Sequence, residues 1–210
     1  SFDDKATTVT ATITQHTRVG YESGVLMPER FIMDITQGDN ARYDYHLIEM
    51  TKETDGNSYC APEGMELLWA NDSHNAWVKA MTVPMGLSTV DAENVMTINV
   101  SSEQNNAINV AASDVLGATS DANGGITISG SNINVEFRHL LSKLDVKYTF
   151  RSEFDENSVT VNSITLQNIC TSGGYSYADM DYDSTNLKYG DIVMYNNTSA
   201  STAEAIFYPY

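Results

Sequence analysis

The chain has 210 residues, with 28 acidic and 11 basic side chains and a formal net charge of -17. This excess of negative charge argues against nucleic-acid binding and against peripheral membrane binding, since both depend on clusters of Lys and Arg. The length allows one large or two small domains, each with a hydrophobic core of its own.

The first ten residues, SFDDKATTVT, lack the basic start and apolar core of a signal peptide. No apolar run approaches the roughly 18 residues that span a bilayer. A signal removed during export would not be visible in this sequence, so the compartment stays open at this point.

Strand signals dominate the chain, because short stretches carry an apolar residue at every second position. In chain order these stretches are TTVTATITQ (7–15), RFIMDI (30–35), RYDYHL (42–47), MELLWA (65–70), AWVKAMTV (76–83), VMTINV (95–100), GITI (125–128), INVEF (133–137), LDVKYTF (144–150), SVTVNSITLQ (158–167), IVMY (192–195) and EAIFY (204–208). Turn-forming residues separate them, for example in TDGN (54–57), DANGG (121–125) and TSGG (171–174). Many short strands with such turns predict an all-β, antiparallel sandwich.

Helix signals are few. The best candidates are SDVLGATS (113–120), where Ser113 would cap a single turn, and HLLSK (139–143).

The alternation changes phase in the stretch 135–150. Apolar side chains occupy odd positions from Val135 to Leu141 and even positions from Leu144 to Phe150. Since the side-chain period of a strand is two, this change moves the apolar set to the other face unless one residue is absorbed. Either a β-bulge interrupts one continuous strand, or the chain passes from one core to another.

Catalytic motifs are missing from the sequence. The four histidines are scattered, without HExxH spacing, and neither a G-x-S-x-G motif nor a Gly-rich phosphate loop occurs. His139 is most simply a buried or half-buried imidazole bonded to the backbone. The sequence therefore predicts no enzyme and no cofactor.

An acidic stretch, DMDYDSTNLKYGD, begins at Asp179. Asp179, Asp181 and Asp183 have the 1, 3, 5 spacing of a calcium loop, but Ser184 stands at position 6 instead of Gly, and Gly190 at position 12 instead of Glu. The stretch is either a weak calcium candidate or a solvated acidic loop.

Cysteine occurs only at Cys60 and Cys170. The two residues either form a disulfide or remain buried free thiols, because pairing needs a Cα separation near 5.5 Å that sequence does not reveal.

The stretch VEFRHLLSKLDVKY (135–148) is similar to the F-x-H-x-L-S-K-L signature of the fimbrillin family, the fimbrial subunits of anaerobic gut and oral bacteria. Further resemblances follow in the family's order: ATITQHTR (11–18), SDVLGATS (113–120), VNSITLQNICTSGGY (161–175) and AIFYPY (205–210). The sequence departs from the pattern at Tyr210, where Gln is usual, and before Phe31, where a W-x-x-G-D-x-I-G run is missing. It also stops where the family continues.

The resemblance implies two consecutive transthyretin-like antiparallel β-sandwich domains, over residues 1–141 and 142–210, with the second incomplete and open at an apolar edge. The signature would lie at their junction. Phe137 and Leu141 would finish the first sandwich, Ser142 and Lys143 would carry the turn, and Leu144 would start the second. The signature residues are Phe137, His139, Leu141, Ser142, Lys143 and Leu144.

The resemblance also implies a function. Fimbrillins are lipoproteins exported to the outer membrane and cell surface, so a lipid-bearing Cys would precede Ser1. They assemble into a fimbrium by donation of a β-strand between subunits. The partners would be other fimbrial subunits, with host or bacterial surface ligands besides. Arg18 is the candidate for cleavage by an Arg-directed protease, or a plain surface residue at a strand end. The alternative function is a secreted β-sandwich module that binds carbohydrate or calcium.

Overall fold

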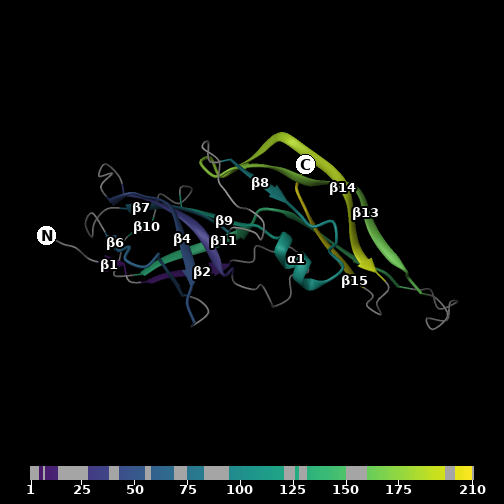
Figure 1. The fold of residues 1–210 in the computed structure, drawn as a ribbon, viewed down its shortest axis with the longest axis horizontal. Helices are drawn as coiled ribbons and strands as arrows, with labels where there is room; N and C mark the ends of the chain where they lie inside the picture. Colours follow the sequence, from purple (N-terminus) through teal and green to yellow (C-terminus); the bar gives the residue numbers. More distant parts are fainter. Residues whose placement is uncertain are drawn as a thin grey trace. The chain divides into compact units, whose positions relative to one another are not determined.

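Strands make up nearly all the regular structure, as the alternating pattern predicts (Figure 1). The computed structural model describes residues 5–6, 8–13, 28–37, 43–54, 58–68, 75–82, 95–120, 126–127, 132–149, 160–196 and 202–209. Among the described residues, the pairing of Thr8–Ile13 with Asn132–His139 is parallel and the other strand pairs are antiparallel. The predicted fold class is confirmed.

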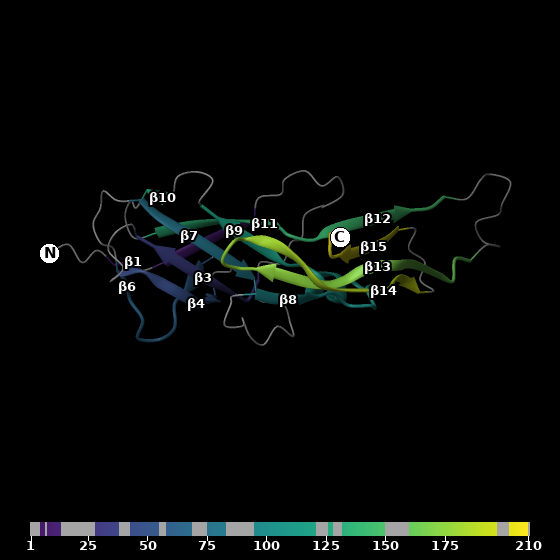
Figure 2. The ribbon, with the colours of Figure 1, turned by 90° about the horizontal axis from the view of Figure 1, so that it is seen from above.

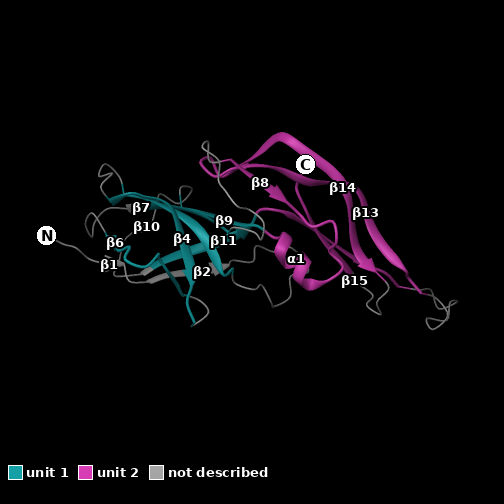
Figure 3. Ribbon diagram, in the orientation of Figure 1, with its two compact units in different colours: residues 1–83, 115–139 teal, residues 84–114, 140–210 magenta. Residues whose placement is uncertain are grey.

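Packing divides the chain into two compact units (Figure 3). Unit 1 comprises Ser1–Val83 and Val115–His139, and unit 2 comprises Pro84–Asp114 and Leu140–Tyr210. This division differs from a single cut after residue 141, because the segment 84–114 belongs with the later part of the chain. The reason is strand pairing: the strand at Val95–Asn99 forms its ladder with Ser172–Ser176.

The regular structure described in unit 1 consists of strands. They are β1 (Lys5–Ala6), β2 (Thr8–Ile13), β3 (Arg30–Thr36), β4 (Tyr45–Lys52), β5 (Ser58–Cys60), β6 (Leu67–Leu68), β7 (Asn75–Thr82), β9 (Leu116–Thr119), β10 (Ile126–Thr127) and β11 (Asn132–His139). The eight-stranded sheet has the order β10-β7-β3-β4-β5-β2-β11-β9, and β9 also pairs with β7. The ladder from β7 through β3, β4, β5, β2, β11 and β9 therefore returns to β7 as a closed circuit of strands, which we call the strand ring.

Aromatic side chains form the centre of the unit 1 core. The ring centroids of Phe31 and Tyr59 lie 4.8 Å apart, and those of Phe31 and Phe137 lie 5.1 Å apart in an edge-to-face arrangement. Inward residues of β3, β4, β7 and β11 surround them: Met33, Ile35, Ile48, Met50, Ala76, Val78, Ala80, Ile133 and Val135. The alternation read from the sequence thus corresponds to the buried face of these strands.

Unit 2 contains β8 (Val95–Asn99), α1 (Ala107–Ser113), β12 (Ser142–Lys147), β13 (Ser163–Ser176), β14 (Asp181–Asn196) and β15 (Thr202–Phe207). Its strands form a three-stranded sheet, β14-β13-β8, and a two-stranded sheet, β12-β15 (Figure 2). In the described part of the chain both sheets of unit 2 are narrow and have outer strands with a ladder on one side only.

The helix predictions were wrong. The helix covers Ala107–Ser113, so it ends at the first residue of SDVLGATS, while Asn106 caps its start by accepting a hydrogen bond from the Asn109 amide at 2.9 Å. Part of SDVLGATS is strand β9, which pairs with β7 and β11 and has its first three residues, Leu116, Gly117 and Ala118, buried. HLLSK is not helical either, because β11 ends at His139 and β12 begins at Ser142.

The stretches TSGG and 179–191 lie largely in β13 and β14 instead of in loops. Gly173 stands in β13 because a Cβ there would lie 2.4 Å from the Tyr208 ring. The two glycines of TSGG therefore serve close packing and not a turn.

Candidate assembly surfaces

Strand β2 closes the strand ring between β5 and β11. It pairs with β11 in parallel over six residue pairs, from Thr8–Asn132 to Ile13–Phe137, and with β5 over two, Val9–Tyr59 and Thr10–Ser58. Without β2, the backbone groups of β5 and β11 that face it would lose their ladder partners. Such exposed edges are templates for pairing with another chain.

The two strands that flank β2 carry fully buried apolar side chains. Tyr59 lies on β5, and Ile133, Val135 and Phe137 alternate along β11. An incoming strand in the place of β2 would thus meet backbone partners on both sides and a continuous apolar core. These are the two requirements of strand addition.

Tyr59 also ties this region to the segment before β3. Its hydroxyl donates a 2.7 Å hydrogen bond to the Pro28 carbonyl. Burial, together with the negative charge of Glu29, raises the pKa of Tyr59 to about 12. The phenol is therefore neutral at physiological pH and remains a hydrogen-bond donor.

The signature residues lie at the passage from β11 to β12. Phe137 is fully buried in unit 1, and His139 is half-buried at the end of β11. Leu141 is also fully buried, but it belongs to unit 2 and does not finish the first core. The change of phase in the sequence falls at the break between β11 and β12, which pair with different strands.

Lys143 does not carry a turn, as it lies within β12 beside Ser142. Its ammonium group forms ion pairs with Glu204 at 3.1 Å and with Asp145 at 3.3 Å, and only 7% of its side chain is exposed. Leu144, expected to start the second core, is 36% exposed instead. On the neighbouring strand β15, Ala203, Ala205 and Ile206 are buried.

Tyrosines of β13 and β14 pack with Tyr208, which directly follows β15. The rings of Tyr175, Tyr182 and Tyr208 pack edge to face, with centroids 5.4 Å and 5.6 Å apart. The Tyr208 hydroxyl donates to the Gly174 carbonyl, and the Tyr182 hydroxyl donates to the Leu140 carbonyl. These tyrosines are therefore packing residues and not an exposed recognition cluster, whereas Tyr189 is 55% exposed.

The calcium candidates accept hydrogen bonds from neighbouring residues of the chain. Asp179 accepts from the Ser176 hydroxyl at 2.7 Å, Asp181 from the Tyr182 amide, and Asp183 from the Thr185 amide. The bond from Thr185 lowers the pKa of Asp183. Within the described residues no group of three or more acidic, His or Cys side chains could hold a metal ion.

Arg18 lies outside the described residues. Cys60 is exposed and Cys170 is buried, and both are free thiols, so the disulfide alternative is wrong and the expected burial of Cys60 is wrong too. In the described part of the chain, no helix is long and apolar enough to cross a membrane.

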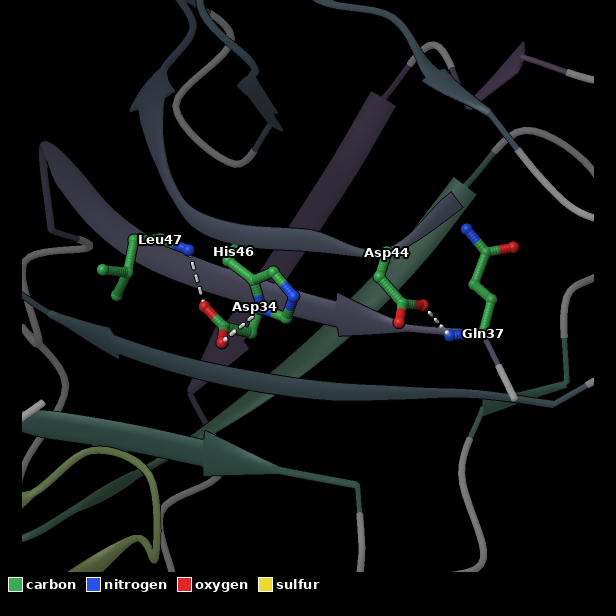
Figure 4. A network of polar contacts seen from close by, with 5 residues as sticks. All are labelled: Asp34, Gln37, Asp44, His46 and Leu47. Carbon is green, nitrogen blue, oxygen red and sulfur yellow. Dashed lines mark hydrogen bonds and ion pairs between the residues drawn. The ribbon is translucent and has the colours of Figure 1, made fainter. Parts of the chain in front are cut away.

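A polar network shapes the β3–β4 pair of unit 1 (Figure 4). The ladder register shifts between Met33 and Ile35, and Leu47 adopts a φ of 51°. The Asp34 carboxylate accepts from the Leu47 amide at 2.7 Å and lies 3.3 Å from the His46 imidazole. Asp34 thus satisfies the donor that this bulge takes out of the ladder.

Sequence reasoning missed Gln104, a fully buried side chain that bonds the backbone of β15. An isolated Gln in the polar run SSEQNN gives no signal for such a role. It also missed β5 and β9, which are too short to show alternation.

Comparison with solved structures shows the same fold in two proteins solved as candidate cell adhesion proteins. The first, from Bacteroides uniformis, has a TM-score of 0.66 and 18% identity, and the match covers 97% of this chain and 74% of that one. The second, from Bacteroides ovatus, has a TM-score of 0.65 and 14% identity, and the match covers 99% of this chain and 79% of that one.

A fimbrial protein from Bacteroides ovatus matches with a TM-score of 0.50 and 10% identity, over 100% of this chain and 42% of that one. No protein with curated annotation matches significantly. The model of the fimbrillin-like family matches residues 5–210, nearly the whole chain. The chain therefore belongs to the fimbrillin-like family, a family of structural fimbrial proteins and not of enzymes.

Proposed function

We propose that this protein is a subunit of a bacterial surface fimbria, exported as a lipoprotein to the outer membrane and joined to neighbouring subunits by β-strand donation. Membership of a fimbrillin-like family supports a role at the cell surface among other fimbrial subunits. The likeness to candidate adhesion proteins supports a further role in binding host or bacterial surface ligands. The lipid-bearing Cys is proposed to precede Ser1.

The position of β2 carries the proposal of strand donation. This strand is near the start of the chain, and its pairing with β11 is the one parallel strand pair of the strand ring in the described residues. Its place between β5 and β11 offers backbone pairing on both sides and a buried apolar lining. A strand from another subunit would regain these same interactions.

Proteolysis at Arg18 is the proposed trigger. Arg18 follows the last residue of β2, Ile13. A cut there would separate β2 covalently from β3 and from the rest of unit 1, leaving only noncovalent contacts to hold it. Exchange of a short, noncovalently held strand for a donated one then requires no further covalent change.

The experiment treats the full chain with an Arg-specific protease and follows the products by mass spectrometry and light scattering after size exclusion. We expect cleavage at Arg18, loss of residues 1–18 and appearance of oligomers that resist dilution. The matched control, Arg18→Ala, is expected to stay intact at this bond and monomeric. Cleavage after residue 18 that leaves a stable monomer would contradict the proposal.

A further inference from the structure

An amine and two carboxyl groups meet on one face of the β12–β15 sheet (Figure 2). Lys143 and Asp145 are two residues apart on β12, so their side chains point to the same face. Glu204 lies opposite Asp145 on β15. The Lys143 nitrogen Nζ is 3.1 Å from Glu204 Oε1 and 3.3 Å from Asp145 Oδ1. One nucleophile and two carboxyl groups are thus held together across a strand pair.

The amine of this cluster is secluded from water. Only 7% of the Lys143 side chain is exposed, against 22% for Asp145 and 43% for Glu204. Ile206, which lies opposite Lys143 in the ladder, is 1% exposed. The Asp145 Oδ1 atom is buried and accepts no hydrogen bond, so its contact is the ion pair with Lys143. Exclusion of water strengthens the interactions between such groups and protects a bond formed among them from hydrolysis.

The distances also suit a reaction between these groups. Since Oε1 is bonded to Cδ, the 3.1 Å contact brings the Lys143 nitrogen close to the roughly 3 to 3.5 Å at which an attack on that carbon begins. Asp145 lies beside the same nitrogen and is placed to accept its proton. Lys143 is a diagonal neighbour of Glu204, a position that long side chains can bridge between two strands.

We propose that Lys143 and Glu204 condense into an intramolecular amide that joins β12 covalently to β15, with Asp145 as the group that moves the proton. Glu204 is the acceptor because its carboxylate is the nearer one and lies on the other strand. An amide with Asp145 would link two residues of one strand and would join nothing. The inference concerns unit 2 alone and does not depend on strand donation.

The condensation needs no further reactant. A proton passes from the Lys143 ammonium to the Glu204 carboxylate, which gives a neutral amine and a carboxylic acid. The nitrogen attacks Cδ and forms the C–N bond, while Asp145 takes a proton from the nitrogen and returns it to the departing hydroxyl, which leaves as water. One positive and one negative charge disappear together. Effective molarities of groups fixed in this way reach roughly 10⁵ M or more, which offsets the tendency of water to hydrolyse the amide.

Mass spectrometry of the full chain, folded and incubated at neutral pH, tests the bond. We expect a mass lower than that of the sequence by one water molecule. Trypsin, applied after denaturation, should leave one cross-linked species that contains residues 139–147 and 189–210, with no cleavage after Lys143. An unchanged mass with cleavage after Lys143 would overturn the proposal, as would a loss of water located elsewhere in the chain.

Two variants separate the bond from the ion pair. Lys143→Arg keeps the positive charge and its contacts with carboxylates, but its guanidinium does not form the amide. We expect this variant to have the full mass of its sequence and a lower melting temperature, because its unfolded state lacks the cross-link. Lys147→Arg is the matched control, since Lys147 lies on the same strand with an exposed side chain and should leave the loss of water unchanged. A loss of water in Lys143→Arg would refute the assignment.

Asp145→Asn tests the proton transfer, because it retains both reacting groups. In freshly synthesised protein, this variant is expected to reach the lower mass roughly 100-fold more slowly than the unmodified chain. An equal rate would limit Asp145 to a structural ion pair and refute its part in the step. Should a variant fail to fold, the mass and the tryptic fragments of the unmodified protein decide alone whether the bond exists.

Discussion

The two units deal with strand edges in different ways. Unit 1 closes its sheet with strands, so that β7, β3, β4, β5, β2, β11 and β9 each have a ladder partner on both sides. Unit 2 has sheets of three and two strands, and side chains bind some of the backbone groups that another strand would otherwise pair. Gln104 binds the edge of β15, and Tyr208 binds the Gly174 carbonyl in β13.

The difference bears on assembly. An edge closed by a strand opens only when that strand leaves, which favours an irreversible trigger such as proteolysis. The edge of β15 is covered by the buried Gln104, whose segment bonds Val193, Asn109 and Ser113.

The largest expected effect tests whether the signature residues Phe137 and Leu141 belong to two separate cores. Phe137→Ala should lower the free energy of unfolding of unit 1 by about 4 kcal/mol, because a fully buried aromatic ring is lost. Leu141→Ala, only four residues later, should cost unit 2 about 3 kcal/mol. Hydrogen exchange resolves the units, and equal loss of protection in both from either substitution would argue for one shared core.

Alkaline pH should weaken unit 1 through Tyr59. The pKa of this phenol is raised to about 12, so the folded state holds the proton more tightly than the unfolded state, whose pKa is near 10. Its contribution is complete below pH 10 and is lost as the pH rises through 12, by roughly 2 kcal/mol up to that pH. Urea unfolding from pH 9 to 12 measures this loss of stability. Tyr59→Phe has no phenol to ionise at this position, so its stability should fall less over the same pH range.

Gly173→Ala should destabilise unit 2 by about 2 kcal/mol, as overpacking does. The added Cβ would lie 2.4 Å from the Tyr208 ring, which must move and strain its bond to Gly174. Gly190→Ala is the control, because its Cβ would meet Thr171 at an ordinary 3.6 Å. Equal melting temperatures of the two variants would show that Tyr208 is not fixed against β13.

The smallest expected effect is an increase in stability. Leu47→Gly should stabilise unit 1 by about 0.5 kcal/mol, since Leu47 has a φ of 51° and its side chain is 42% exposed. Asp34→Ala should have the opposite sign, because the Leu47 amide loses its acceptor. Chemical denaturation compares the three proteins, and a loss of stability in Leu47→Gly would mean that the exposed side chain contributes more than the backbone costs.

The sequence predicts the strands with clear alternation and the position of the core change. RFIMDI and AWVKAMTV became β3 and β7, and the change of phase fell between β11 and β12. Its errors concern tertiary contacts. Gly173 was assigned to a turn, because the residue that its Cβ would meet, Tyr208, lies far along the sequence and leaves no local signal. The role of Gln104 depends on Ile206, 102 residues away, and no local pattern reveals it.

The most direct test of strand donation is to lock β2 in place. Thr10 and Asn134 lie opposite each other in the β2–β11 ladder, so Thr10→Cys with Asn134→Cys offers a disulfide across it, in a background of Cys60→Ser and Cys170→Ala. After cleavage at Arg18, light scattering should find the reduced protein in oligomers and the oxidised protein as a monomer. Oligomers of equal size from the oxidised protein would contradict the exchange of β2.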